Sequence, residues 1–408
     1  MNPAILQQAL ARIETLGAIS DTPGALTRTF LSPASRKAAE VVMNWMEELG
    51  MTTAHDAGGT VRGILPGTDP TRQPMLLGSH LDTVIDAGKY DGALGIIAAL
   101  SALEHLREDG VQLAYPVHLF GFSDEEGVRF QSTYLGSRGI LADDAGETII
   151  HRDAEGRTLD EVLSTEGWHE DAIEFSYDAS SSSGYVELHI EQGRVLEEAG
   201  EPACVVSAIC AQARLRITLV GMADHAGTTP MDLRRDALTG AAECILAVEK
   251  IARKSPPLVG TVGMIRVSPG ASNAIPQIAE LTLDVRHPDD SALGNALLEL
   301  HREFLEIASR RQLDLQWLEV QKNGAITCDP DLTGQLAASL TRITGSKLSL
   351  PSGAGHDGVV LSKAMPIAML FIRCRAGLSH HPDEYAEPGD IAIGINVLAD
   401  FLKHRTLP

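Results

Sequence analysis

The chain is poor in residues that cross-link a protein, anchor it in a membrane or bind nucleic acid. Five cysteines among 408 residues are an odd number without CxxC spacing, which excludes a disulfide framework or zinc ribbon and favours a reducing cytoplasm. The chain has no run of 18 apolar residues and no basic leader, so we expect a soluble, unexported protein without a membrane partner. Lys and Arg number 33 against 55 Asp and Glu, and the net charge of −22 argues against nucleic acid.

Apolar residues, by contrast, are plentiful. They make up 44% of the 408 residues, enough for a sizeable core and more typical of two domains than of one. The first part alternates helical and strand patterns, which predicts an α/β fold with a mostly parallel sheet and helices on both faces. From Ala211 the order becomes βαββαβ, the pattern of a ferredoxin-like unit, and α/β patterns return after Gln321. We therefore expect one domain from residues 1–210 and 322–408, interrupted by an inserted domain at 211–321.

The individual elements follow from periodicity and from helix start and stop signals. Helices are expected at 35–49, 92–107, 233–254, 292–310 and 332–344. Strands are expected at 61–65, 75–77, 214–220, 258–267, 278–286, 313–320 and 366–372. A polar, Ser-rich stretch at 178–184 indicates a loop, and it leads into another strand pattern that ends near a His and a Gln.

Side chains that bind metal follow two of the buried strand patterns. The apolar run 74–77 leads to His80, and the run 116–122 leads to Glu126. Asp91 lies between them, directly before a helical pattern. Open α/β sheets bind ligands outside the carboxyl ends of their strands. The three side chains are therefore predicted to meet at that edge of the sheet.

The chemistry of these side chains suits a metal centre. Imidazole and carboxylate ligands bind zinc or manganese, and a carboxylate such as Asp91 can bridge two ions about 3.5 to 4 Å apart. Asp82 could fix the imidazole tautomer of His80 without binding the metal itself. Glu125 would stay free of metal and take a proton from water. The alternative is that Asp124–Glu126 is only a solvated acidic turn, but its place after a buried strand favours the site.

Eight motifs spread over most of the chain, in order, strengthen this interpretation. They resemble the M20 metallopeptidase-like amidohydrolases, specifically the hydantoinase/carbamoylase branch: GSHLDTV, KYDGALG, DEEGVRF, ELHIEQG, DHAGTTPM, SNAIP, GAGHD and SHHPDEY. In ELHIEQG, His189 stands where ordinary M20 peptidases usually have an acidic ligand, which indicates the branch that hydrolyses ureido groups. That branch includes allantoate amidohydrolases, N-carbamoyl-L-amino-acid hydrolases and ureido-acid hydrolases.

The resemblance implies two divalent ions per chain, zinc or manganese, held by three histidines and two carboxylates. The implied ligands are His80 and His189 for one ion, Glu126 and His380 for the other, and Asp91 as the bridge. Glu125 is then the general base. His381 would replace His380 if the register shifted by one residue, but the spacing of the family motif favours His380. On its own, His189 on an alternating strand is more typical of a satisfied core histidine.

The resemblance also implies the residues that meet the substrate. They are Gln192, Asn273, Arg286 and His356. The planar fork of Arg286 suits a carboxylate, although a lone Arg at a strand end is more often a surface cation. In the family, the residue matching His225 comes from the neighbouring subunit and stabilises an oxyanion. This implies a homodimer in which the inserted domain serves as lid and dimerisation domain. No role is expected for His118, His151, His169, His287 and His301.

The activity implied is hydrolysis of a ureido (carbamoyl) C–N bond in a small carboxylate-bearing substrate, with release of ammonia and carbon dioxide. Within the branch we favour allantoate, because the segment 371–382 looks most like allantoate amidohydrolases. The alternatives are an N-carbamoyl-L-amino-acid hydrolase, an aminopeptidase or N-acyl deacylase on the same fold, and an inactive binding protein. The presence of Glu125 together with all five implied ligands argues against the inactive protein.

Overall fold

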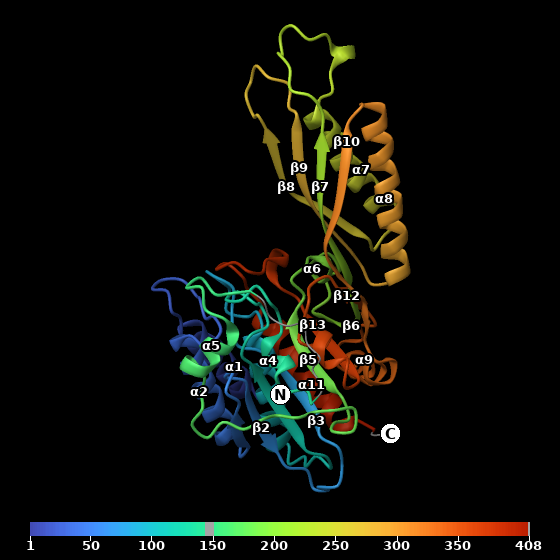
Figure 1. Cartoon of the computed structure of the whole chain (residues 1–408). Helices are drawn as coiled ribbons and strands as arrows, with labels where there is room; N and C mark the ends of the chain where they lie inside the picture. The colour runs from blue at the N-terminus through green and yellow to red at the C-terminus, as the bar shows by residue number, and fades with distance from the viewer. Residues whose placement is uncertain (143–150, 407–408) are drawn as a thin grey trace. The chain divides into compact units, whose positions relative to one another are not determined.

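The computed structural model describes residues 1–142 and 151–406, which divide into two compact units (Figure 1). Unit 1 comprises Met1–Ser207, Cys328–Leu350 and Ala354–Pro408, and unit 2 comprises Ala208–Thr327 and Pro351–Gly353. Unit 2 is thus inserted between two stretches of unit 1. Residues Pro351–Gly353, which come later in the sequence, also belong to unit 2. Each unit has its own hydrophobic core.

Unit 1 is built on a sheet with the strand order β1-β2-β4-β3-β5-β13-β6-β11, in which β12 also pairs with β6. Its four central strands are parallel: β4 (Val117–Phe122), β3 (Met75–His80), β5 (Tyr185–Ile190) and β13 (Ile367–Ile372). Antiparallel pairs flank them, with β2 (Val61–Leu65) and β1 (Thr52–His55) on one side and β6 (Ala203–Ile209) and β11 (Ile326–Thr327) on the other, while β12 spans Ser349–Ser352. Every residue of β3, β5 and β13 is buried, which is the expected state of parallel strands covered on both faces.

Several helices of unit 1, though not all, begin at a residue whose side chain caps them. The side chain of Ser32 accepts a hydrogen bond from the backbone N–H of Ser35, and a proline occupies the first turn of the helix that follows. The longer helices are α1 (Pro3–Gly17), α2 (Pro33–Glu48), α3 (Ala93–Glu108), α9 (Pro330–Thr344) and α11 (Pro388–His404). The shorter ones are α4 (Leu135–Arg138), α5 (Leu159–Glu166), α6 (Val195–Ala199), α10 (Gly358–Leu361) and the 3-10 turn Arg375–Gly377.

Unit 2 is a four-stranded antiparallel sheet with two long helices on one face (Figure 1). The chain runs β7 (Ala211–Val220), α7 (Ala237–Lys254), β8 (Val259–Ser268), β9 (Ile278–His287), α8 (Asp290–Arg310) and β10 (Asp314–Asn323). The strand order is β10-β7-β9-β8. This is the ferredoxin-like arrangement, so the predicted fold class is confirmed for both sheets. In β7, Leu215 and Ile217 are buried while Arg214 and Arg216 are exposed, and this alternation gives the sheet one apolar face.

One helix of unit 2 starts later than its periodicity suggested. The pattern predicted a helix from Leu233, but residues Met231–Leu233 form a separate 3-10 turn and α7 begins at Ala237. The cause is Asp236, whose carboxylate accepts hydrogen bonds from the backbone N–H groups of Leu238 and Thr239 and so fixes the start. Among the described residues, no helix combines the length and apolar character that a membrane span requires.

Candidate metal centre

Four adjacent parallel strands deliver polar side chains to one edge of the unit 1 sheet. His80 is the last residue of β3, and His189 lies one residue before the end of β5. Glu126 follows β4 and His380 follows β13. Because the carboxyl ends of parallel strands meet at the same edge, residues far apart in the sequence become neighbours there.

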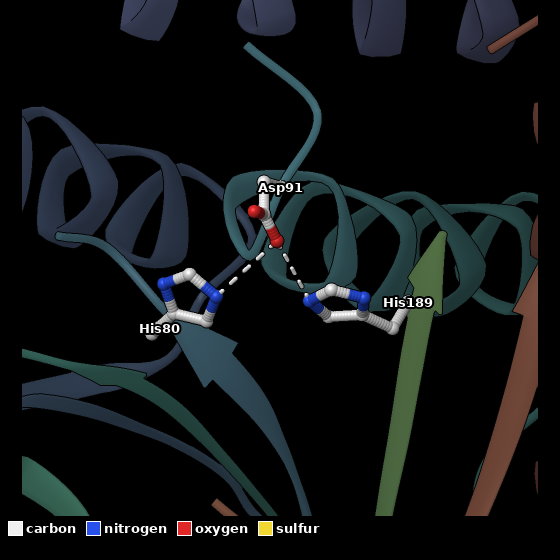
Figure 2. Close-up of side chains that lie close together, drawn as sticks. All are labelled: His80, Asp91 and His189. Carbon is white, nitrogen blue, oxygen red and sulfur yellow. Dashed lines mark ion pairs between the residues drawn. The ribbon is translucent and has the colours of Figure 1, made fainter. Parts of the chain in front are cut away.

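The carboxylate of Asp91 lies at the centre of this edge, and Figure 2 shows it between two imidazoles. Its Oδ1 is 3.1 Å from Nε2 of His189 and 3.6 Å from Nε2 of His80. Its Oδ2 is 3.2 Å from Nε2 of His380, and that nitrogen is 3.3 Å from Oε1 of Glu126. The two oxygens therefore face different groups of side chains. Potential ligand atoms lie within 4.8 Å of one another in the groups His80, Asp91 and His189; His80, Glu125 and Glu126; and Asp91, Glu126 and His380.

The turn that presents Asp91 requires a glycine. Gly92, directly before α3, has a φ of 66°, which L side chains adopt only with strain. A Cβ added there would lie 2.5 Å from Cε1 and Nδ1 of the His80 imidazole. The missing side chain of Gly92 therefore allows both the turn and the close approach of His80.

The two buried imidazoles are oriented by backbone carbonyl groups. Nδ1 of His80 lies 3.0 Å from the carbonyl oxygen of Asp82, and Nδ1 of His189 lies 2.9 Å from that of Ile190. A carbonyl can only accept, so each Nδ1 carries a hydrogen and each Nε2 is directed toward Asp91. Without a metal ion, Nε2 can also carry a hydrogen and donate it to Asp91; once deprotonated, it is the nitrogen that a metal ion would bind.

The carboxylate of Asp82 fixes the turn that carries the two glutamates. Its Oδ1 accepts a hydrogen bond of 2.9 Å from the backbone N–H of Glu125, and its Oδ2 accepts one of 3.1 Å from that of Glu126. The Oδ1 atom also lies 3.4 Å from Nδ1 of His80. One buried side chain thus ties the end of β3 to the turn after β4.

The charges at this edge are strongly coupled. Burial raises the pKa of Asp91, but hydrogen bonding to His189, His380 and His80 outweighs burial and holds that pKa well below its usual value. Hydrogen bonding to Asp91 and Glu126 raises the pKa of His380 to about 10. The bridging position between the imidazoles therefore strongly favours the ionised carboxylate.

Glu125 lies in a different electrostatic environment from Asp91. Burial raises its pKa well above the usual value; His80 opposes this shift, and the negative charges of Glu126 and Asp357 add to it. A group of carboxylates buried this close together repels itself unless a cation is present. The donor set of imidazole nitrogens and carboxylate oxygens fits zinc or manganese in that role.

Two further residues expected at the site lie against this cluster. Nε2 of Gln192 is 3.4 and 3.3 Å from the two oxygens of Asp91 and donates to Oγ of Ser379 at 3.1 Å. His356 is buried with its ring centroid 4.6 Å from that of His189. Sequence reasoning placed Gln192 and His356 only on substrate, whereas both also pack on the predicted metal ligands.

The buried acids near the cluster that were missed in the sequence include Glu187 and Glu384. Glu187 lies two residues before His189 on β5, and its potential ligand atom falls in one group with those of His189 and His356. The period of two in a strand could have placed it on the same face. Glu384 accepts hydrogen bonds from the backbone of Tyr90 and Asp91, and no local pattern indicates this contact.

The neighbouring histidines of the SHHPDEY motif point to different partners. Nε2 of His380 faces Asp91 and Glu126, as described above. Nδ1 of His381 instead accepts a hydrogen bond of 3.1 Å from the backbone N–H of Asp383. Of the two registers considered, the structure therefore brings His380 rather than His381 to the cluster.

The remaining expected site residues belong to unit 2. His225 is exposed and forms an isolated bridge with Ala274, next to Asn273, whose carbonyl accepts a hydrogen bond from Ala226. Nε and Nη2 of Arg286 donate to the two oxygens of Asp284 at 2.8 and 3.0 Å, and its Nη1 donates to the carbonyl of Gly353 at 2.6 Å. Its guanidinium is thus held in a fixed orientation within the unit.

The chain is similar over most of its length to several known proteins. Peptidase family M20/M25/M40 matches residues 76–404. The chain is 39% identical over 431 residues to a Glycine max protein named allantoate deiminase 1, covering 97% of this chain and 89% of that protein. It is 36% identical over 389 residues to an N-carbamoyl-L-amino acid amidohydrolase of Geobacillus stearothermophilus, covering 95% of each. A solved hydantoinase/carbamoylase family amidase from Burkholderia multivorans superposes with a TM-score of 0.88 at 29% identity and 98% coverage of each chain.

The crowding at Gly92 generates a prediction about metal affinity. Gly92→Ala adds a Cβ that displaces the His80 imidazole, so we expect the affinity for zinc or manganese to fall by about 10-fold or more. Gly110→Ala is the matched control, because Gly110 has a similar φ of 69° but nothing within 4 Å of an added Cβ. Both variants should lose about 1–3 kcal/mol of stability from backbone strain. Competition with a chromophoric chelator measures the affinity, and equal affinities in the two variants would contradict the assigned crowding.

Proposed function

The chain belongs to peptidase family M20/M25/M40 and is a hydrolase that acts on C–N bonds, and we propose that it hydrolyses a ureido C–N bond of allantoate. The products would be ammonia, carbon dioxide and the remaining ureido compound. The observation that carries a two-metal hydrolysis is the Asp91 carboxylate, whose two oxygens face different groups of donors. The choice of allantoate is supported by identities of 39% to allantoate deiminases of Glycine max and Arabidopsis thaliana.

In this proposal, two divalent ions, zinc or manganese, occupy the edge of the unit 1 sheet. His80 and His189 would hold one ion, Glu126 and His380 the other, and Asp91 would bridge them. Such ions supply Lewis-acid polarisation of the ureido carbonyl and acidify water when bound. The support is the grouping of side chains around the two Asp91 oxygens and the orientation of the two buried imidazoles.

Glu125 would move the proton. Its turn is fixed by Asp82, and its carboxyl group is buried beside Glu126. The raised pKa described above suits a group that takes a proton from the attacking water and passes it to the leaving nitrogen. Glu126, which lies 3.3 Å from His380, would serve as a ligand instead.

The proposed contacts with the substrate are those that the family resemblance implies, with Arg286 as partner of the substrate carboxylate: Gln192, Asn273, Arg286 and His356. We also propose a homodimer formed through unit 2, in which His225 serves the site of the neighbouring subunit and stabilises the developing oxyanion. The second candidate function is hydrolysis of N-carbamoyl-L-amino acids, favoured by the 36% identity over 95% of both chains.

A substrate panel tests the proposed reaction. We expect ammonia release from allantoate with a kcat/KM about tenfold or more above that for N-carbamoyl-L-methionine, after reconstitution with manganese or with zinc. An N-acyl amino acid and a dipeptide, followed by amine release, represent the deacylase and aminopeptidase alternatives. A higher kcat/KM for N-carbamoyl-L-methionine would establish the second candidate instead, and turnover of the dipeptide alone would refute ureido hydrolysis.

The proposed base generates a prediction that separates metal binding from catalysis. Glu125→Gln keeps the size of the side chain but cannot take a proton, so kcat should fall by roughly 10²-fold or more while the metal content stays unchanged. Glu126→Gln is the matched comparison, because it removes a proposed ligand and should lower metal content as well. Metal analysis and steady-state kinetics read out both variants. Loss of metal in Glu125→Gln would show that this residue is a ligand.

The proposed dimer is tested by subunit complementation. His225→Ala and Arg286→Ala should each be nearly inactive alone. If His225 acts across the interface, a mixed dimer contains one site that lacks both residues and one that lacks neither, so mixing should restore part of the activity. If both residues serve the same chain, every site stays damaged. The control is proof of subunit exchange with differently tagged chains, and exchange without recovered activity would exclude the crossed arrangement.

A further inference from the structure

The side chain of Glu384 accepts hydrogen bonds from the backbone that carries Asp91. Glu384 belongs to the SHHPDEY motif, from which only the histidine has so far been given a role. Its side chain is buried, and its Oε1 accepts hydrogen bonds from the backbone N–H groups of Tyr90 at 2.9 Å and Asp91 at 3.0 Å. One oxygen thus satisfies both donors of the turn before α3.

The second oxygen of Glu384 reaches the side chain of Asp91 through a serine. Oγ of Ser379 lies 2.9 Å from Oε2 of Glu384 and 3.2 Å from Oδ2 of Asp91. That Asp91 oxygen is the one that faces His380. Gln192 donates to the same Oγ at 3.1 Å, which keeps the hydroxyl in place. The single hydroxyl hydrogen of Ser379 can be donated to only one of these two carboxylates at a time, so Glu384 contacts the backbone of Asp91 directly and shares the Ser379 hydroxyl with its carboxylate.

Two features of the surrounding backbone accommodate the contact between Glu384 and the turn that carries Asp91. Gly88 lies against Glu384, and a Cβ at that position would fall 2.3 Å from Cβ and 2.4 Å from Cδ of the glutamate. His380 has a φ of 56°, a sparsely populated conformation for a residue with a side chain. The turn that holds Ser379, His380 and Glu384 is thus kept in a strained shape, and strain of this kind persists only where neighbouring contacts impose it.

We propose that Glu384 is a positioning residue that fixes the orientation of the Asp91 carboxylate and thereby sets the affinity for the metal pair. This inference rests on the bridging role proposed for Asp91. A buried carboxylate next to another carboxylate costs free energy, and an uncharged residue could tie down the turn at lower cost. One oxygen of Glu384 accepts from the turn while the other lies within hydrogen-bond distance of Ser379; an amide at this position keeps the first contact and can donate to the Ser379 oxygen.

The test compares metal affinities of the full chain in the absence of substrate. Glu384→Ala leaves two backbone N–H groups without their acceptor and frees Ser379, so the affinity for manganese or zinc should fall by about 10- to 100-fold. Glu384→Gln keeps an oxygen that accepts from Tyr90 and Asp91, and should remain within about threefold of the unchanged protein. Asp383→Asn is the neighbouring control, since the side chain of Asp383 is 84% exposed and should not matter. Chelator competition measures all four proteins.

A kinetic comparison separates positioning from a merely structural role. At saturating metal, Glu384→Ala should lower kcat while KM stays within about twofold, and Glu384→Gln should restore most of kcat. If Glu384→Ala binds metal within about threefold of the unchanged protein, the residue only stabilises the fold and the proposal is wrong. If that variant does not fold, Ser379→Ala carries the test: it removes the hydroxyl shared with the Asp91 carboxylate, and with it the acceptor of Gln192, but leaves the contacts of Glu384 with the backbone in place, and it should still weaken metal binding several-fold.

The outcomes distinguish this inference from the proposed function. Metal affinity is measured without substrate, so a chain that ignores allantoate but loses metal on Glu384→Ala would refute the substrate and support the positioning role. If instead the chain hydrolyses allantoate and its metal affinity does not change in Glu384→Ala or in Ser379→Ala, the substrate is supported and the positioning role of Glu384 is refuted. Failure of the unchanged protein to bind any divalent ion would overturn the bridging role of Asp91 and, with it, this inference.

Discussion

The side chains at the strand ends of unit 1 are arranged so that they compensate one buried negative charge, that of Asp91. The Asp91 side chain is only 4% exposed, and an ionised carboxylate at such a place is unstable unless cations or hydrogen-bond donors surround it. Three imidazoles arrive from the ends of three parallel strands, and Gly92 removes the side chain that would keep one of them away. The strand order β3-β5-β13 therefore does more than form the core of unit 1. It also brings these three imidazoles to the same carboxylate.

The same edge carries more negative charge than the histidines can offset. Besides Asp91, six acids there are fully or nearly fully buried: Asp82, Asp124, Glu125, Glu187, Asp357 and Glu384. In a medium of low dielectric their mutual repulsion opposes folding, and protonation or a bound cation relieves it. A divalent ion bound at Asp91, as proposed, would therefore act on stability as well as on chemistry, because whatever binds only the folded state stabilises it by mass action. Metal affinity and the stability of unit 1 would then depend on the same group of buried charges.

The sequence alone predicted the parts of this site that depend on local pattern. Apolar runs that end in His80 and before Glu126 predict strand ends, and strand ends of a parallel sheet converge. His189 could not be assigned in this way, because a histidine within an alternating strand is typical of a core residue; only the family motif pointed to it. The contact between Glu384 and the backbone of Asp91 spans 293 residues, and no periodicity encodes such a separation. The start of α7 was misplaced because hydrophobic periodicity outweighed the capping signal of Asp236.

The guanidinium of Arg286 in unit 2 is held in one orientation by groups of the same unit. A free arginine side chain loses rotamer entropy when it binds a carboxylate, and that loss weakens binding. In unit 2, Asp284 accepts from Nε and Nη2 of Arg286, and the carbonyl of Gly353 accepts from Nη1, so the guanidinium plane is already set. Asp284 also reduces the net positive charge there, which weakens a purely Coulombic attraction. Discrimination by Arg286 would then depend on the geometry of its partner more than on charge, and an acid of the wrong shape would gain little from it.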